Sequence, residues 1–191
     1  MYKKVSKFAL LGALLLSALA CNLFKGAPTP PAPPIPVTTE SVEELHQNLQ
    51  DAAATAAASG EFNLDLTEAQ LTSLIALELA KETNQSVTNP QVYLRDGQIQ
   101  LFGTIVTENG QSADGTVFFT VEVDVQGNLA VKVVSAFIGS VPIPTAILDQ
   151  ITSRLIQSLN QQITLDGNQV VVDSITIADG VMKMKGHKPN P

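Results

Sequence analysis

Hydrophobic and polar residues alternate along several segments of the chain, with the two-residue period of a strand that buries one face. The clearest segment covers residues 116–125, where valine and phenylalanine alternate with threonine and acidic residues. The same period predicts strands at residues 62–66, 90–94, 99–105, 129–137, 170–177 and 181–185. Turn signals separate them: Asp-Gly at 96–97, 166–167 and 179–180, and Gln-Gly-Asn at 126–128. We therefore expect antiparallel hairpins.

Three other segments carry apolar residues at the spacing of three and four that is typical of an amphipathic helix. They cover residues 41–59, 67–82 and 144–160. Capping-box patterns at Ser41–Glu44 and Thr67–Gln70 predict the starts of the first two helices. Pro144 starts the third, because proline is tolerated in the first turn of a helix. The first of these helices is rich in alanine, which favours helix but buries little area.

The elements follow one another as helix, strand, helix, four strands, helix and two strands. This order, with tight turns between strands, predicts an α+β fold rather than an alternating α/β fold. Gly103 lies inside a predicted strand, where it permits sharp bending. We expect a strongly curved antiparallel β-sheet of about six strands, wrapped around the amphipathic helices, in a single α+β domain at residues 40–188.

Residues 1–20 have the pattern of a secretory signal peptide. Lysines at positions 3, 4 and 7 precede an uncharged apolar run, which is shorter than the ~20 residues that span a bilayer as a helix. The run ends at Ala18-Leu19-Ala20-Cys21, and Cys21 is the chain's only cysteine. This ending resembles the lipobox of bacterial lipoproteins, although alanine stands at position 18 where leucine is usual. The alternative is an ordinary signal peptide followed by a coincidental cysteine.

The lipobox resemblance implies that Cys21 becomes a lipidated first residue, which would attach the protein to the outer face of the cytoplasmic membrane or to the outer membrane. Residues 21–39 would then be a linker whose prolines favour an extended polyproline II conformation. At ~3.1 Å per residue this linker could hold the domain up to ~50 Å from the lipid. We expect the linker to be disordered and dispensable for folding. We also expect a polar tail from Gly186, with residues 189–191 outside the domain.

Composition argues against several functions. The chain has 11 Lys and Arg against 18 Asp and Glu, no tryptophan and only 5% aromatic residues, so we expect no nucleic-acid binding. His46 and His187 stand near opposite ends, which disfavours a histidine metal centre and a catalytic relay. Carboxylates such as Glu122 and Asp124 alternate with valine, as on a solvated strand face. We expect no metal, no cofactor and no enzymatic activity.

Several turn and cap residues form one series along residues 61–186. They are Thr67–Leu71, Arg95-Asp96-Gly97, Gly127-Asn128-Leu129, the stop at 139–144 and the hairpin at 177–180. The series resembles that of small bacterial envelope proteins of the LmeA, YpmS and YceB kind, which are thought to be related to tubular lipid-binding (TULIP-like) domains. The resemblance implies a long helix cradled by a bent antiparallel sheet, with an apolar groove for a phospholipid-like ligand. It brings no catalytic motif.

The candidate lining of such a groove consists of apolar residues on two helices and one strand. They are Leu71, Leu74, Ile75, Leu79, Val117, Phe119, Val121, Leu148, Ile151 and Leu155. The alternative is that these side chains fill one another as an ordinary core. The leading hypothesis is a membrane-anchored envelope lipoprotein that binds or shuttles a phospholipid-like ligand. The alternatives are a structural or adaptor lipoprotein that docks a protein partner, and an envelope hydrolase with an unrecognised site.

Overall fold

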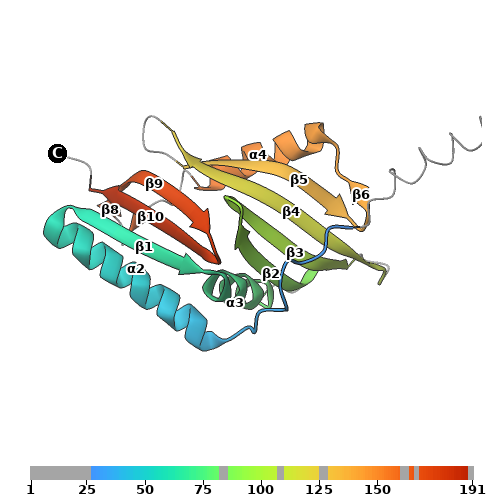
Figure 1. Ribbon diagram of the computed structural model, residues 1–191, viewed down its shortest axis with the longest axis horizontal. Helices are drawn as coiled ribbons and strands as arrows, with labels where there is room; N and C mark the ends of the chain where they lie inside the picture. The colour runs from blue at the N-terminus through green and yellow to red at the C-terminus, as the bar shows by residue number, and fades with distance from the viewer. Residues whose placement is uncertain are drawn as a thin grey trace, which may run out of the picture.

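The computed structural model describes residues 27–81, 86–106, 110–124, 129–159, 164–165 and 168–188. Its helices are α2 (Thr39–Ser59), α3 (Glu68–Leu79) and α4 (Thr145–Leu159). Its strands are β1 (Glu61–Thr67), β2 (Val87–Arg95), β3 (Gln98–Val106), β4 (Ser112–Val123), β5 (Leu129–Ile138), β6 (Val141–Pro142), β7 (Thr164–Leu165), β8 (Asn168–Gln169), β9 (Val171–Ala178) and β10 (Val181–His187). The α+β class with antiparallel strands is confirmed (Figure 1).

The strands form two main sheets, which corrects the expectation of one curved sheet of about six strands. Five strands pair in the order β2-β3-β4-β5-β6 and three in the order β1-β10-β9, while β7 and β8 pair with each other. The second sheet joins β1 to β10, from the other end of the described chain. The two sheets meet at their turns, where the Gly97 N–H donates to the Ile177 carbonyl (3.2 Å) and the Gly180 N–H to the Leu94 carbonyl (3.1 Å).

These meeting turns are the Asp-Gly hairpins predicted at 96–97 and 179–180. Asp96 and Gly97 have φ values of 54° and 73°, and Asp179 and Gly180 have 52° and 84°. Positive φ at both central residues suits a two-residue hairpin, and glycine adopts it without a Cβ clash. The antiparallel pairings of β2 with β3 and of β9 with β10 confirm both predictions. The turns predicted at 126–128 and 166–167 lie outside the described residues.

The first two helices begin at threonine N-caps. The Thr67 hydroxyl accepts from the Gln70 N–H (3.2 Å), and the Gln70 side chain accepts from the Thr67 N–H (3.0 Å), which confirms the predicted capping box. The predicted start of α2 at Ser41 is wrong. Thr38 is the N-cap, and its hydroxyl accepts from the Ser41 N–H (3.2 Å). The N-cap therefore lies three residues earlier than predicted, at Thr38.

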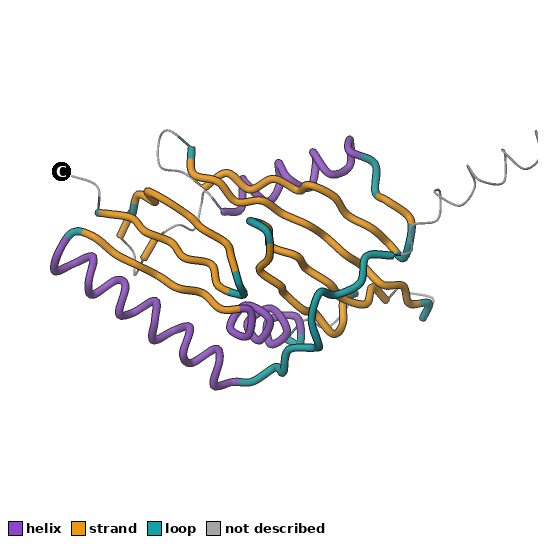
Figure 2. Tube along the Cα trace, in the orientation of Figure 1, coloured by secondary structure: helices purple, strands orange, loops and turns teal. Residues whose placement is uncertain are grey.

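Residues 27–38, which we call the strap, lie along the five-stranded sheet. The expectation that residues 22–39 are disordered is therefore wrong for residues 27–38. The Ile35 N–H donates to the Gln91 side-chain oxygen (2.6 Å), and the Gln91 amide nitrogen donates to the Ile35 carbonyl (3.3 Å). Figure 2 shows the strap as a loop that crosses the strands before α2. One glutamine thus holds a backbone segment much as a neighbouring strand would.

Helix α3 closes the free edge of β2. The Val92 N–H donates to the Thr72 hydroxyl (2.9 Å), and the Leu94 N–H donates to a Glu68 carboxylate oxygen (2.6 Å). Glu68 also forms an ion pair with Arg95. An unpaired strand edge is a template for aggregation, and here the side chains of Thr72 and Glu68 occupy it. The same bonds fix α3 against one face of the sheet.

The expectation of a polar tail from Gly186 is wrong, because Gly186 and His187 belong to β10. A methyl group on Gly186 would overlap the Val171 carbonyl oxygen and the Phe62 ring, so only glycine fits this position. The imidazole Nδ1 of His187 lies 2.9 Å from an Asp173 carboxylate oxygen. Residues 189–191 lie outside the described part of the chain.

Two hydrophobic clusters form the described core. The larger joins α2, the three-stranded sheet and β2, and its buried members are Leu45, Ala52, Ala56, Phe62, Leu64, Leu66, Val92, Leu94, Val172, Ile177 and Met182. Ala52 and Ala56 lie one turn apart on α2, and their small side chains let this helix approach β1 closely. The smaller cluster lies between β5 and α4 and contains Val133, Ala136 and Leu148.

Candidate functional site

The candidate groove residues do not come together in one place. Three on α3 pack against the larger cluster: Leu71, Leu74 and Ile75. Three others belong to or pack on the smaller cluster: Val117, Phe119 and Leu148. The candidates on α3 therefore contact one part of the core and those on β4 and α4 another, because α3 and α4 cover opposite margins of the five-stranded sheet. The described candidates do not line one common groove.

The remaining candidates are scattered. Leu79 lies beside a separate hollow of about 370 Å³, which Val37 and Pro90 also line. Val121 stands opposite Val131 in the β4–β5 register. The side chains of Ile151 and Leu155 lie outside the described part of the structure, as does Cys21.

The strand candidates belong to a continuous apolar surface on β3 and β4. The register sets Ile99 opposite Phe119 and Leu101 opposite Val117, and Val121 follows on the same face by alternation. We call these five residues the strip. All five side chains are half-buried, although central strands of a sheet usually hold its most buried residues.

The flanks of the strip are closed. On β2, Val92 and Leu94 are 1% and 0% exposed beside α3, and on β5, Val133 and Ala136 are 4% and 2% exposed beside α4. The apolar face is thus covered at both margins and less completely between them. The strip is therefore the least buried part of this apolar face.

Two glycines stand opposite each other at one end of the strip, Gly103 on β3 and Gly115 on β4. A Cβ atom at Gly115 would lie 2.7 Å from Ile105 Cδ1, and one at Gly103 would lie 3.1 Å from Val87 Cγ1. The glycines therefore leave room for neighbouring aliphatic side chains. At this end of the strip, the Ile105 and Val87 side chains pack closely against the two glycines.

The opposite face of the same sheet carries a row of aromatic rings. Tyr93, Phe102, Phe118 and Phe137 come from four successive strands, with centroids 5.7, 6.1 and 6.4 Å apart in edge-to-face contacts. Edge-to-face rings at such distances attract one another through their quadrupoles. Sequence reasoning missed this row. The available signal was one aromatic residue on the mostly polar face of each of four neighbouring strands.

The strap covers the Tyr93 end of the row. Tyr93 is 0% exposed, and its hydroxyl lies 3.1 Å from the Ala32 carbonyl oxygen and 3.3 Å from that of Pro33. Because prolines lack an N–H, carbonyl oxygens are the polar groups that such a segment offers. Burial raises the pKa of the Tyr93 phenol above its ordinary value of 10.0, and the charge of Glu68 raises it further.

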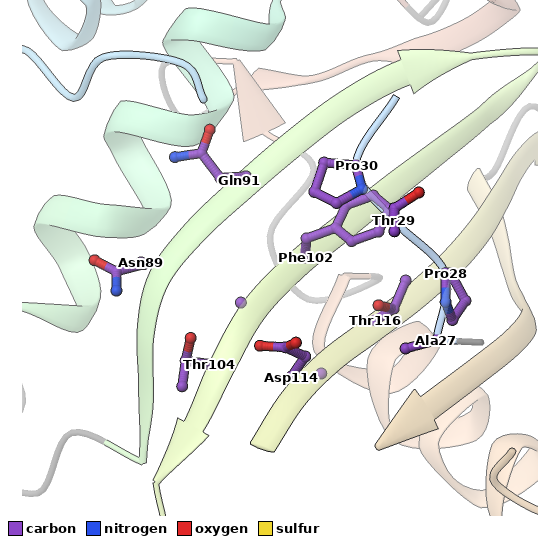
Figure 3. Close-up of a pocket in the computed structure, with 12 residues that line it drawn as sticks. Ala27, Pro28, Thr29, Pro30, Asn89, Gln91, Phe102, Thr104, Asp114 and Thr116 are labelled. Carbon is purple, nitrogen blue, oxygen red and sulfur yellow. The ribbon is translucent and has the colours of Figure 1, made fainter. Parts of the chain in front are cut away.

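A pocket of about 240 Å³ lies beneath the start of the strap. Figure 3 shows its lining, with Pro28, Thr29 and Pro30 of the strap beside Phe102 and Thr116 of the sheet. Most of its other side chains are polar. Among the described residues, no group of three or more histidine, cysteine or acidic side chains could hold a metal ion.

Two comparisons with known proteins found no match. No protein-family model matches it, and no curated protein is significantly similar in sequence. Within the described ranges, no helix combines the length and the apolar character needed to cross a membrane.

Proposed function

We propose that this protein is a membrane-anchored lipoprotein of a bacterial cell envelope, and that it binds the acyl chains of a phospholipid-like ligand along the strip. The main observation in favour of lipid binding is the half-buried apolar surface on β3 and β4, between the buried flanks under α3 and α4. The leader that ends at Cys21 supports the anchor. A binding role is favoured over catalysis, because the strip presents no ionisable side chain.

The dimensions of the strip suit an acyl chain. From Val117 to Val121, β4 rises about 13 Å at ~3.3 Å per residue. Each methylene group that leaves water for such a surface contributes ~0.8 kcal/mol. The apolar side chains on β3 and β4 can contact an acyl chain along the whole strip, and neither partner needs a hydrogen bond there. The headgroup would remain outside the strip.

Val121→Trp tests the proposal. The indole would occupy the proposed acyl-chain channel along the strip, so we expect the variant purified from membranes to lose the lipid that native mass spectrometry detects on the wild type. The matched control is Thr120→Trp, which adds the same ring to the same strand on the opposite face. It should retain the lipid.

Thermal unfolding separates a channel from a filled core. In a channel, Val121→Trp changes the unfolding temperature little, whereas overpacking a tight core costs about 1–3 kcal/mol. A wild type without lipid, together with a strongly destabilised Val121→Trp, would exclude the channel. The hypothesis of an adaptor lipoprotein that docks a protein partner would then be favoured.

A further inference from the structure

Three large apolar side chains are exposed at one end of the domain. Ile138 and Val141 flank the β5–β6 turn and are 45% and 66% exposed, and Ile147 in the first turn of α4 is 47% exposed. Ile138 and Val141 pair with each other across the turn. We call these three residues the tip. Side chains this apolar are seldom left in water together without a partner.

The strap begins beside this end. Ala27 lines the same pocket as Asp114 and Gly115. Gly115 pairs with Ile138 in the β4–β5 register, and the Gly139 N–H donates to the Asp114 carbonyl (2.6 Å). Figure 1 shows the first described residues of the strap next to β6. The chain therefore enters the described fold next to the β5–β6 turn.

The docked strap shortens the path to Cys21. Six residue steps separate Cys21 from Ala27, which gives a reach of at most about 22 Å at 3.3–3.6 Å per residue. β4 alone, with 12 residues, is about 40 Å long at ~3.3 Å per residue. A lipid on Cys21 would therefore keep this end of the domain towards the bilayer, rather than letting the domain rotate freely on a ~50 Å linker.

From this placement we propose that the tip is a membrane-contact surface that enters the interface of the bilayer to which Cys21 is attached. The inference rests on the lipid anchor of the proposed function. It adds the orientation of the domain and the residues that contact lipid.

The backbone of the tip suits an apolar surrounding. An unpaired N–H is costly to remove from water. The Ile143 N–H donates to the Ala136 carbonyl (2.8 Å), as the Gly139 N–H does to Asp114. Pro142 and Pro144 have no N–H to satisfy. Bilayer contact therefore leaves few backbone donors without partners.

The charge of the tip indicates apolar rather than electrostatic attraction. Residues 138–150 contain no lysine or arginine, and Asp149 is their single acidic residue. A basic patch would favour anionic lipids, and none stands here. The tip should therefore contact zwitterionic phosphatidylcholine as well as anionic vesicles.

The chain lacks tryptophan and has one cysteine, Cys21. A single tryptophan can therefore be introduced as a fluorescent reporter, and the Cys21 thiol can serve as the site of attachment to lipid. The chain from Cys21 onward is coupled through its thiol to phosphatidylcholine vesicles that carry a maleimide lipid. Val141→Trp reports on the turn and Ile147→Trp on α4. The control is Thr176→Trp, on the exposed outer face of the three-stranded sheet. Chemical coupling supplies the anchor whether or not the cell lipidates Cys21, so the tip and the anchor are tested separately.

We expect coupling to shift the emission of both tip reporters to the blue, and doxyl-labelled lipids to quench them but not Thr176→Trp. Unchanged emission at both tip positions overturns the proposal. Equal quenching of all three positions also overturns it, since the domain would then have no fixed orientation. If the emission of the tip reporters shifts to the blue as the protein concentration rises, before any vesicle is added, then a second copy of the protein covers the tip instead.

Discussion

The hydrogen bond between Tyr93 and the strap can be measured by a double-mutant cycle. Tyr93→Phe removes only the hydroxyl that contacts the Ala32 and Pro33 carbonyls. A typical intramolecular hydrogen bond contributes about 1 kcal/mol, so the free energy of unfolding of the chain from Cys21 onward should fall by about that amount. For a chain of this size, such a loss lowers the unfolding temperature by about 2–4 °C.

The second arm of the cycle removes residues 22–36. Without the strap, the Tyr93 hydroxyl can bond to water, so Tyr93→Phe should then cost close to nothing. The difference isolates the contact, because the entropy of ordering the strap cancels between the two arms. Urea unfolding gives all four free energies. Equal costs of Tyr93→Phe with and without the strap would refute the docking that we describe.

Alkaline titration of Tyr93 is an independent test of its contact with the strap. Burial raises the pKa of the folded phenol above 10.0, so the folded chain holds this proton more tightly than the unfolded chain. The resulting stability is fully present below pH 10 and is lost as the pH rises through the folded pKa. Removing the strap should return the phenol pKa towards 10.0. Tyr93 is the only tyrosine in the chain from Cys21 onward, so the absorbance change on titration belongs to this residue alone.

Two further changes test the anchor and the core. Cys21→Ser should release the protein from the membrane fraction and abolish the acyl mass on its first residue; an unmodified wild type that stays in the membrane would contradict this. Gly186→Ala should lower the free energy of unfolding by about 1–3 kcal/mol, because its methyl group would overlap the Phe62 ring and the Val171 carbonyl. Lys185→Ala, next to it on the exposed face, should change urea unfolding little.

Local signals predicted the local structure well. The Asp-Gly pairs at 96–97 and 179–180 marked hairpins because few residue pairs tolerate positive φ twice in succession. Thr67 and Gln70 marked the start of α3 because their bonds are made within one turn. Each of these features depends on residues fewer than five positions apart. The α2 cap was misplaced because Thr38 and Ser41 both offer a suitable hydroxyl, and the sequence alone does not rank them.

The errors concern contacts between distant residues. Pairing of β1 with β10 divides the strands into two sheets, and nothing in either strand's alternation specifies that partner. Docking of the strap depends on Gln91 and Tyr93, more than fifty positions later in the chain. Composition alone assigns such a proline-rich run to an extended linker. The shared face of Val117 and Phe119 could be predicted because strand residues two positions apart lie on the same side of a sheet. The pattern around Leu71 and Leu74 did not indicate which part of the core these side chains would fill.

The two faces of the five-stranded sheet offer different ligand chemistry. Beneath the strap, the pocket is lined by Asp114, Thr104 and Gln91, and Gln91 already bonds to Ile35. A ligand that reached deeper into this pocket would have to replace the hydrogen bonding between Gln91 and Ile35. The strip requires no such exchange, because its aliphatic and aromatic side chains lose only contact with water when an acyl chain covers them. An acyl chain would therefore bind more readily on the helix-covered face than beneath the strap.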